Sequence, residues 1–163
     1  MPRRRPLDPP SPPTGTPRVA ALRLLGRRDY TRTELTTRLI DRGYAQDDVE
    51  AAIDTLVADR AIDDRRTAFA HVRTAARIKG RGRLRIAREL ERRGIAKDLI
   101  REALAELPKE DERQAIARFI ERKRLPAKPS PQERRRIFGQ LVRRGFPIDA
   151  VMKALGGRAP DDE

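Results

Sequence analysis

The spacing of the arginines in this sequence indicates a surface that binds anions. Four arginines in the segment 79–95 follow one another at helical spacing: Arg81, Arg85, Arg88 and Arg92. At about 100° per residue, this spacing brings their side chains onto a single stripe of an α-helix. Ile86, Ala87 and Leu90 fall on the opposite side, so the segment predicts an amphipathic helix whose apolar side faces a core.

The cations around this stripe form a larger predicted binding surface. Residues 73–93 contain nine Lys or Arg and two acids, Glu89 and Glu91. In residues 134–144, Arg136, Gln140 and Arg143 form a smaller stripe opposite an apolar helical face, with Arg134, Arg135 and Arg144 nearby. We predict that a partner contacts the following cations: Arg77, Lys79, Arg81, Arg83, Arg85, Arg88, Arg92, Arg93, Arg134, Arg135, Arg136 and Arg143. The competing interpretation is that these charges merely solvate the surface, but residues 18–62 are nearly balanced in charge whereas the following residues are not.

Residues for catalysis are missing from the sequence. His71 is the only histidine and cysteine is absent, so a histidine-based triad, a multi-histidine metal site and a disulfide cannot be built. With apolar neighbours, His71 is expected to be a partly buried packing residue. The pair Asp63–Asp64 lacks the second acidic cluster that a Mg²⁺ site would need. The turn 80–82 is too short for a nucleotide-binding loop. The sequence therefore predicts that the protein is not an enzyme and holds no metal or cofactor.

The composition narrows the class of partner. Across 163 residues, 38 Lys and Arg against 25 Asp and Glu give a net charge of +13, which favours nucleic acid, an acidic protein surface or anionic lipid. Aromatic residues make up 4%, which argues against a platform for stacking single-stranded bases. Asparagine is absent, so base-specific readout has little support. No apolar run approaches the ~20 residues of a membrane helix, and we expect a cytoplasmic monomer without membrane contact.

The elements that must position these cations repeat along the chain. Residues 90–95 have counterparts at 39–44 and 141–146, each 51 positions from the next, and all three end in arginine, glycine and a large apolar or aromatic residue. A glycine after a helix can adopt the left-handed conformation while the next residue folds back onto the last turn. Apolar positions coincide at the same spacing, as at Leu35, Ile86 and Ile137. Such a period in a helical pattern predicts stacked three-helix units.

We therefore predict an all-α fold of three tandem three-helix modules. The modules span residues 18–62, 63–108 and 109–157, and the second is the most basic. A proline-rich basic tail at 1–17 is expected to be disordered, and an acidic tail at 158–163 is expected to be frayed. The expected core of the first module is Leu22, Leu24, Leu25, Leu35, Leu39, Ile40, Val49, Ala52, Ile53, Leu56 and Val57.

Residues with capping chemistry mark where these helices begin and end. Residues 31–34 and 130–133 have the pattern of a capping box, in which a hydroxyl and a glutamate satisfy backbone N–H groups reciprocally. The acidic pair before the helix that begins near Arg65 is expected to cap that helix. We assign structural roles to eight residues: Thr31, Glu34, Gly43, Asp63, Asp64, Gly94, Ser130 and Gly145.

Several of these motifs, in this order and spacing, resemble the RecX family of bacterial regulators of the RecA recombinase. They are Ala21-Leu22-(x2)-Leu25 with Arg28, Glu34-Leu35, Ile62-Asp63-Asp64, and Lys79-Gly80-Arg81-Gly82-(x3)-Ile86-(x2)-Glu89-Leu90-(x3)-Gly94-Ile95. The resemblance runs from about Val19 to Leu155. It implies an elongated, curved array of modules that lodges in the groove of the RecA–DNA filament. It also implies that the protein reduces ATP hydrolysis, strand exchange and the filament-stimulated self-cleavage of the SOS repressor, with weak, non-specific binding of DNA.

Two other classes of function remain open from the residues alone. The chain could be a stand-alone nucleic-acid-binding or transcription-regulating repeat protein whose modules dock on phosphates, which predicts an affinity for DNA that falls steeply with salt. It could also be a structural scaffold, which predicts binding neither to RecA nor to DNA.

Overall fold

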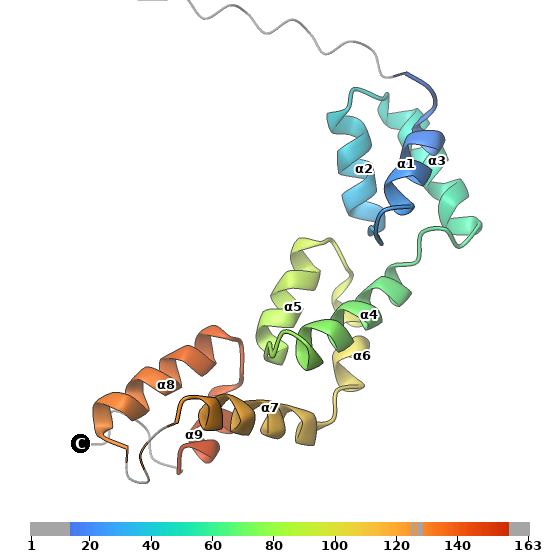
Figure 1. Cartoon of the computed structure of the whole chain (residues 1–163). Coiled ribbons are helices and arrows are strands. Elements are labelled where there is room, and N and C mark those ends of the chain that lie inside the picture. Colours follow the sequence, from blue (N-terminus) through green and yellow to red (C-terminus); the bar gives the residue numbers. More distant parts are fainter. Residues whose placement is uncertain (1–13, 125, 127–128, 157–163) are drawn as a thin grey trace, which may run out of the picture. The chain divides into compact units, whose positions relative to one another are not determined.

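The computed structural model of the chain describes residues 14–124, 126 and 129–156 (Figure 1). Most of the two predicted tails, residues 1–13 and 158–163, lies outside the described residues. Within the described ranges every regular element is a helix, as predicted: α1 Pro17–Leu25, α2 Arg32–Asp41, α3 Gln46–Ala58, α4 Asp64–Arg77, α5 Arg83–Arg92, α6 Lys97–Ala105, α7 Lys109–Arg122, α8 Pro131–Arg143 and α9 Ile148–Ala154. Helix α1 begins at Pro17, one residue before the predicted start of the first module, because Thr16 accepts a hydrogen bond from the N–H of Val19 and proline suits the first helical turn.

The chain divides into two compact units, and the first, residues 1–64, contains α1 to α3. Both α1 and α2 pack against α3, around a core that includes Leu35, Leu39, Val49 and Ile53. The N–H of Arg32, at the start of α2, donates to Oδ1 of Asp64 over 2.9 Å. A carboxylate of the acidic pair that was expected to cap the next helix thus accepts a hydrogen bond at the N-terminus of α2.

Three predicted core residues of the first unit are exposed instead: Leu22, Ile40 and Val57 are 45%, 42% and 38% exposed. Helix α1 buries Ala20, Ala21 and Leu24, and Leu22 lies about 200° around the helix from Leu24. Ile40 and Val57 each follow a buried leucine and therefore lie about 100° from it. Each helix of this unit packs mainly against the other two, so the buried stripe on each is narrower than the apolar pattern indicates.

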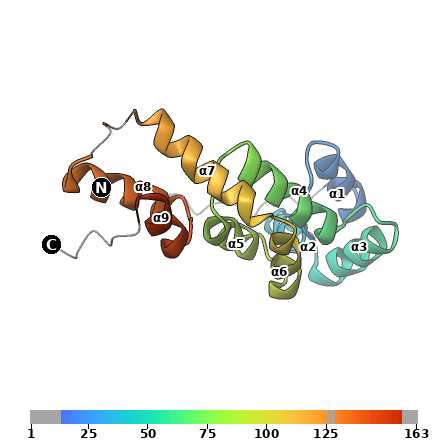
Figure 2. The same cartoon turned by 90° about the horizontal axis from the view of Figure 1, so that it is seen from below.

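The second unit, residues 65–163, contains α4 to α9 and two clusters of buried side chains. One cluster joins α4, α5 and α6 around Ile86 and Leu90, and the other joins α7, α8 and α9 around Ile137 and Leu141. Helix α7 lies between the α4–α6 group and the α8–α9 pair, as both views of the cartoon show (Figures 1 and 2).

Helices α2, α5 and α8 end in the same way. Gly43, Gly94 and Gly145 have φ angles of 89°, 78° and 85°, in the left-handed region that glycine tolerates. At the end of α5, the N–H of Gly94 donates to Glu91 O over 2.9 Å and that of Ile95 donates to Leu90 O over 3.1 Å. These two bonds make a Schellman motif, and the corresponding bonds occur after α2 and α8. The motif turns Ile95 and Phe146 back into the core.

Helices α2 and α8 also begin in the same way. The hydroxyls of Thr31 and Ser130 accept hydrogen bonds from the N–H groups of Glu34 and Glu133, and both glutamates accept a bond from the N–H of the capping residue. Each box satisfies two backbone donors that a helix start would otherwise leave without a partner.

Candidate anion-binding site between the second and third modules

The start of α5 lies directly against the turn that ends α8, and this contact positions the candidate site. The N–H of Gly82 donates to Arg144 O over 2.8 Å, and the N–H of Leu84 donates to Gly145 O over 3.0 Å. The carbonyls at the end of α8 thereby satisfy donors at the start of α5, which has no side-chain cap of its own. The partly negative end of one helix meets the partly positive end of the other, which stabilises the contact.

Only glycine allows the two backbones to come this close. A Cβ atom at Gly82 would lie 2.2 Å from the carbonyl carbon of Gly145, and a Cβ atom at Gly145 would lie 2.3 Å from the backbone nitrogen of Arg85. We call this backbone contact the Gly82–Gly145 seam. Because Gly82 and the residues before it form a turn, Arg81 precedes α5 and is not on its helical stripe, contrary to the sequence prediction.

Ion pairs from α7 brace the same junction. Nε of Arg83 lies 3.1 Å from Oε2 of Glu112, and Nη2 of Arg77 lies 3.5 Å from Oδ2 of Asp111. The Arg83 and Glu112 side chains are 29% and 14% exposed, so this pair is partly shielded from water. Two of the predicted partner-binding cations are therefore already paired with carboxylates of the third module.

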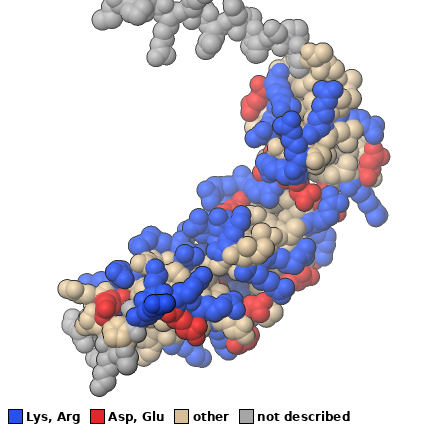
Figure 3. Space-filling view, in the orientation of Figure 1, with Lys and Arg blue, Asp and Glu red and all other residues tan. Residues whose placement is uncertain are grey.

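A cleft of about 510 Å³ opens between the two modules, and we call it the basic cleft. Its lining comes from the turn before α5, from α5, from the end of α7 and from α8. The lining residues are Lys79, Arg81, Arg85, Phe119, Lys123, Gln140, Arg143 and Arg144. Six of them are cations and none is acidic, and Lys and Arg cover much of this unit in the space-filling view (Figure 3).

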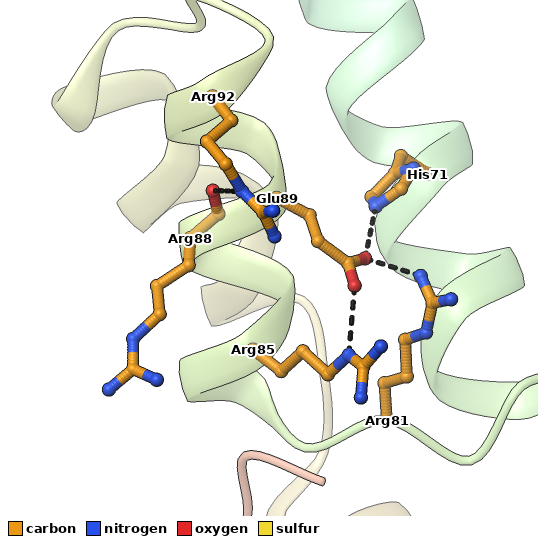
Figure 4. Close-up of polar contacts among 6 residues, drawn as sticks. All are labelled: His71, Arg81, Arg85, Arg88, Glu89 and Arg92. Atoms are coloured by element: carbon orange, nitrogen blue, oxygen red, sulfur yellow. Dashed lines mark hydrogen bonds and ion pairs between the residues drawn. The ribbon is translucent and has the colours of Figure 1, made fainter. Parts of the chain in front are cut away.

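Glu89 lies beside the basic cleft and binds two of its arginines. Its Oε2 accepts from Nη1 of Arg81 over 2.6 Å, and its Oε1 accepts from Nε of Arg85 over 3.0 Å. Nε2 of His71, on α4, is 3.1 Å from the same Oε2 (Figure 4). The Glu89 side chain is 12% exposed, so the carboxylate is a largely buried centre for three partners. His71 is partly buried as predicted, but it also makes a polar contact that its apolar neighbours in the sequence did not indicate.

This network shifts the pKa values of both titratable groups. Burial lowers the pKa of His71 below the ordinary value of 6.5, and the charges of Arg93 and Lys79 act in the same direction against the raising effect of Glu89. Burial raises the pKa of Glu89, but the hydrogen bonds from Arg85, His71 and Arg81 outweigh it and bring that pKa below 4.5. At neutral pH, Glu89 is therefore ionised and His71 is neutral.

Phe119 forms the apolar part of the basic cleft. The ring lies 4.8 Å from the guanidinium carbon of Arg144 and 5.1 Å from Nζ of Lys123, both within the range of a cation–π contact. The residue is 5% exposed, because the two cations and the core of the third module cover it. It holds cations at the cleft and has no open face on which a base could stack.

The structure brings four of the predicted partner-binding residues into the basic cleft: Lys79, Arg81, Arg85 and Arg143. Arg77 and Arg83 pair with α7, whereas Arg88 points away from Glu89 and its carbonyl accepts from Nε of Arg92 (Figure 4). The remaining predicted cations, at 93 and 134–136, do not line the cleft.

Sequence reasoning did not single out Lys123, Phe119 or Glu89 as binding residues, and it placed Gln140 and Arg144 in the smaller basic group of residues 134–144 without listing them as partner contacts. Arg144 is also marked in the sequence because it precedes the glycine of the repeated ending. Lys123 carries no such signal, because α7 does not keep the 51-residue register.

A donor-rich cleft of this kind can bind an anion. Among the described residues, no group of three His, Asp or Glu side chains could hold a metal ion, and no helix there is long and apolar enough to span a membrane.

Comparison with known proteins finds matches along most of the chain. Family models described as the first, second and third three-helix domains of RecX match residues 18–56, 63–104 and 110–155. Regulatory protein RecX of Halorhodospira halophila is 38% identical over 147 residues, which cover 90% of each chain. The RecX protein of Chromobacterium violaceum is 39% identical over 147 residues, covering 89% of this chain and 92% of the relative.

Other relatives match over a shorter part. Regulatory protein RecX of Chromohalobacter salexigens is 44% identical over 89 residues, which span 58% of that relative and 55% of this chain. The crystal structure of RecX from Lactobacillus salivarius superposes with a TM-score of 0.78 at 22% identity, over 85% of this chain and 92% of that one. That likeness shows a shared fold.

Proposed function

Because this chain belongs to the RecX family of regulatory proteins, we propose that it binds the RecA–DNA filament and restrains RecA without being an enzyme. The activities it would reduce are ATP hydrolysis, strand exchange and the filament-stimulated cleavage of the SOS repressor. The observation that carries this proposal is the basic cleft, where six cations from two modules converge without an acidic residue in the lining. A filament of protein and DNA offers anionic surface that such a cleft can contact.

The distribution of charge supports a filament as the partner. Eleven arginines in residues 1–64 are balanced by eleven Asp and Glu, so the whole net charge of +13 lies in residues 65–163. A protein with several modules can accumulate modest contacts over several subunits of a repetitive partner, because each later contact forms at a high effective concentration. The second unit supplies the electrostatic attraction in this proposal.

The test measures the rate of ATP hydrolysis by RecA on single-stranded DNA while this protein is added. The ratio of this protein to DNA is kept far too low for the protein to cover the DNA. We expect inhibition in that range, because a regulator that blocks filament growth or subunit contacts acts at few sites. Binding to bare DNA is measured alongside under the same salt. Inhibition that appears only once the protein saturates naked DNA would contradict filament regulation.

A stand-alone nucleic-acid-binding protein is the second candidate, and the charge concentrated in residues 65–163 favours it. It predicts binding to DNA without RecA, with an affinity that falls steeply as salt is raised. The two candidates separate in the same titration, because this one predicts no effect on RecA until the DNA is covered.

A further inference from the structure

We propose that the basic cleft is a binding site for phosphate groups, in which Glu89 positions two of the arginines that bind them. The inference goes deeper into the function proposed above, since it names the ligand chemistry of the same cleft. It rests on that function only for the identity of the larger partner. Phosphate binding itself is measured without RecA, so that either proposal can fail while the other stands.

The first observation is unneutralised charge. Among the described residues, no Asp or Glu lies within ion-pair distance of Lys79, Lys123, Arg143 or Arg144. Elsewhere on the same unit, by contrast, Arg77 and Arg83 are paired with carboxylates of α7. Cations that converge without a counter-charge repel one another, and an anion bound between them relieves that repulsion.

The second observation is the preorganised geometry of Arg81 and Arg85. Arg81 donates to Glu89 from Nη1, and Arg85 donates to it from Nε. A guanidinium group has five N–H donors in a rigid fork, so each arginine keeps donors that Glu89 does not use. Glu89 fixes both side chains before the ligand arrives, and this lowers the entropy cost of binding. Because Glu89 does not line the cleft, its own charge does not face the ligand directly.

The donor set matches the chemistry of phosphate groups. Planar guanidinium groups match the oxygens of phosphate in pairs, and Lys79 and Lys123 add point charges. Phe119 is covered by Lys123 and Arg144, so the cleft offers no aromatic face to a base. A cleft of about 510 Å³ has room for more than one phosphate. Both the backbone of a nucleic acid and a free polyphosphate present this chemistry.

The experiment compares cleft variants with a matched control on the same helix. Arg85→Ala and Arg144→Ala remove cleft cations, whereas Arg88→Ala removes an equal charge from a side chain that points away from Glu89 (Figure 4). A short oligothymidylate and inorganic tripolyphosphate are titrated into each full-length protein, with calorimetry as the readout. We expect each cleft variant to weaken binding about tenfold, and Arg88→Ala to weaken it about twofold.

Each result of this titration decides something. Loss of affinity for both ligands in the cleft variants supports a general phosphate site. Loss confined to the oligonucleotide assigns the cleft to a nucleic-acid backbone, and loss confined to tripolyphosphate assigns it to a free polyphosphate. If Arg88→Ala weakens binding as much as the cleft variants do, or if no variant weakens it, the cleft is not the site and the proposal is wrong.

The positioning role of Glu89 gives a second test, in which two variants that lose the same charge are expected to change phosphate affinity in opposite directions. Glu89→Gln and Glu91→Gln remove the same charge from neighbouring positions of α5, and Glu91 is exposed. Loss of a negative charge near a cationic cleft should by itself strengthen phosphate binding, so Glu91→Gln is expected to bind slightly more tightly. Glu89→Gln should bind about tenfold more weakly, because Arg81 and Arg85 lose the carboxylate that orients them. The slope of log affinity for the oligothymidylate against log salt should also become less steep, by the share of about two phosphate contacts. A smaller fraction of folded protein would lower the affinity without changing this slope. Tighter binding by Glu89→Gln would rule out the positioning role.

Discussion

At the scale of single residues, Glu89 determines the behaviour of the groups around it. Its carboxylate is largely buried and contacts three side chains: Arg81 from the turn before α5, Arg85 from α5 itself and His71 from α4. Hydrogen bonds to a charged group that is shielded from water are stronger than those at an open surface. The network therefore joins α4 to α5 and at the same time fixes two side chains of the basic cleft.

Lowering the pH should destabilise the second unit through His71. The folded protein holds the pKa of His71 below 6.5, so the unfolded chain takes up the proton first. The contribution of His71 is complete above pH 6.5 and declines as the pH falls from 6.5 toward the lower folded pKa. Glu89 adds a similar decline only below 4.5. Urea unfolding from about pH 8 to about pH 5 should show the His71 decline in the natural protein, and not in His71→Gln.

The chain contains no other histidine, so the natural protein and His71→Gln differ in this range of pH only by the titration of His71. Parallel loss of stability in the two proteins would contradict the assignment.

Neither the network nor its pH dependence could be predicted from the sequence. Helical spacing places Arg85 and Glu89 on one face of α5, but it does not reveal that His71 and Arg81 approach Glu89 from other elements. Contacts of this kind depend on how the helices pack.

At the scale of elements, the sequence predicted most of what can be read from a short pattern. The capping boxes, the three glycine endings and the apolar stripe of α5 are local features, and the structure has them at the predicted positions. The exposure of Leu22, Ile40 and Val57 was not predictable, because it depends on which side of a short helix has neighbours. The Gly82–Gly145 seam was not predictable either, because a glycine in a turn does not indicate which distant segment lies against it.

Alanine at Gly82 should destabilise the second unit by forcing the seam apart. Gly82 has an ordinary φ of −76°, so alanine there brings no backbone strain, but its Cβ would lie 2.2 Å from Gly145. We expect a loss on the order of 3 kcal/mol in the free energy of unfolding, from the steric clash and the weakened bonds to Arg144 O and Gly145 O. Denaturant unfolding of the full chain measures it. Because the seam positions the basic cleft, phosphate binding should weaken as well.

Two glycines elsewhere serve as matched controls. Gly26 has a φ of −65°, and a Cβ atom there would make only ordinary contacts, so Gly26→Ala should change stability by less than about 1 kcal/mol. Gly156 has a φ of +97° and open space around it, so Gly156→Ala reports backbone strain alone, about 1 kcal/mol. Gly145→Ala combines strain and clash and should exceed both. A Gly82→Ala protein as stable as Gly26→Ala would contradict the seam.

At the scale of the whole molecule, the two units differ in both charge and construction. The first is neutral overall and has one core, whereas the second carries the entire net charge and has two cores joined at the seam. The repeat in the sequence predicted three equivalent modules and did not indicate that two of them form one unit. The two modules are joined at the seam by hydrogen bonds from Gly82 to Arg144 O and from Leu84 to Gly145 O, and Gly82 and Gly145 lie at different points of the repeat.

This division predicts how a core defect spreads through the chain. Leu35 and Ile137 occupy equivalent positions of the repeat, and both are fully buried. Truncation to alanine should cost each module about 2–5 kcal/mol. With Leu35→Ala, amide hydrogen exchange should accelerate in α1 to α3 and stay unchanged in α4 to α9. With Ile137→Ala, exchange should accelerate in α7 to α9 and also at the start of α5, because the N–H of Leu84 relies on Gly145 O.

Hydrogen exchange with peptide-level mass spectrometry resolves these segments in the full-length protein. The amide of Leu84 is the most informative reporter, since it belongs to the second module but its acceptor belongs to the third. If Ile137→Ala leaves exchange across residues 82–86 unchanged, the two modules open independently and the seam does not couple them. If it does accelerate exchange there while α1 to α3 keep their protection, the second unit responds as one body. A regulator built in this way presents its basic cleft only while both modules of that unit are folded.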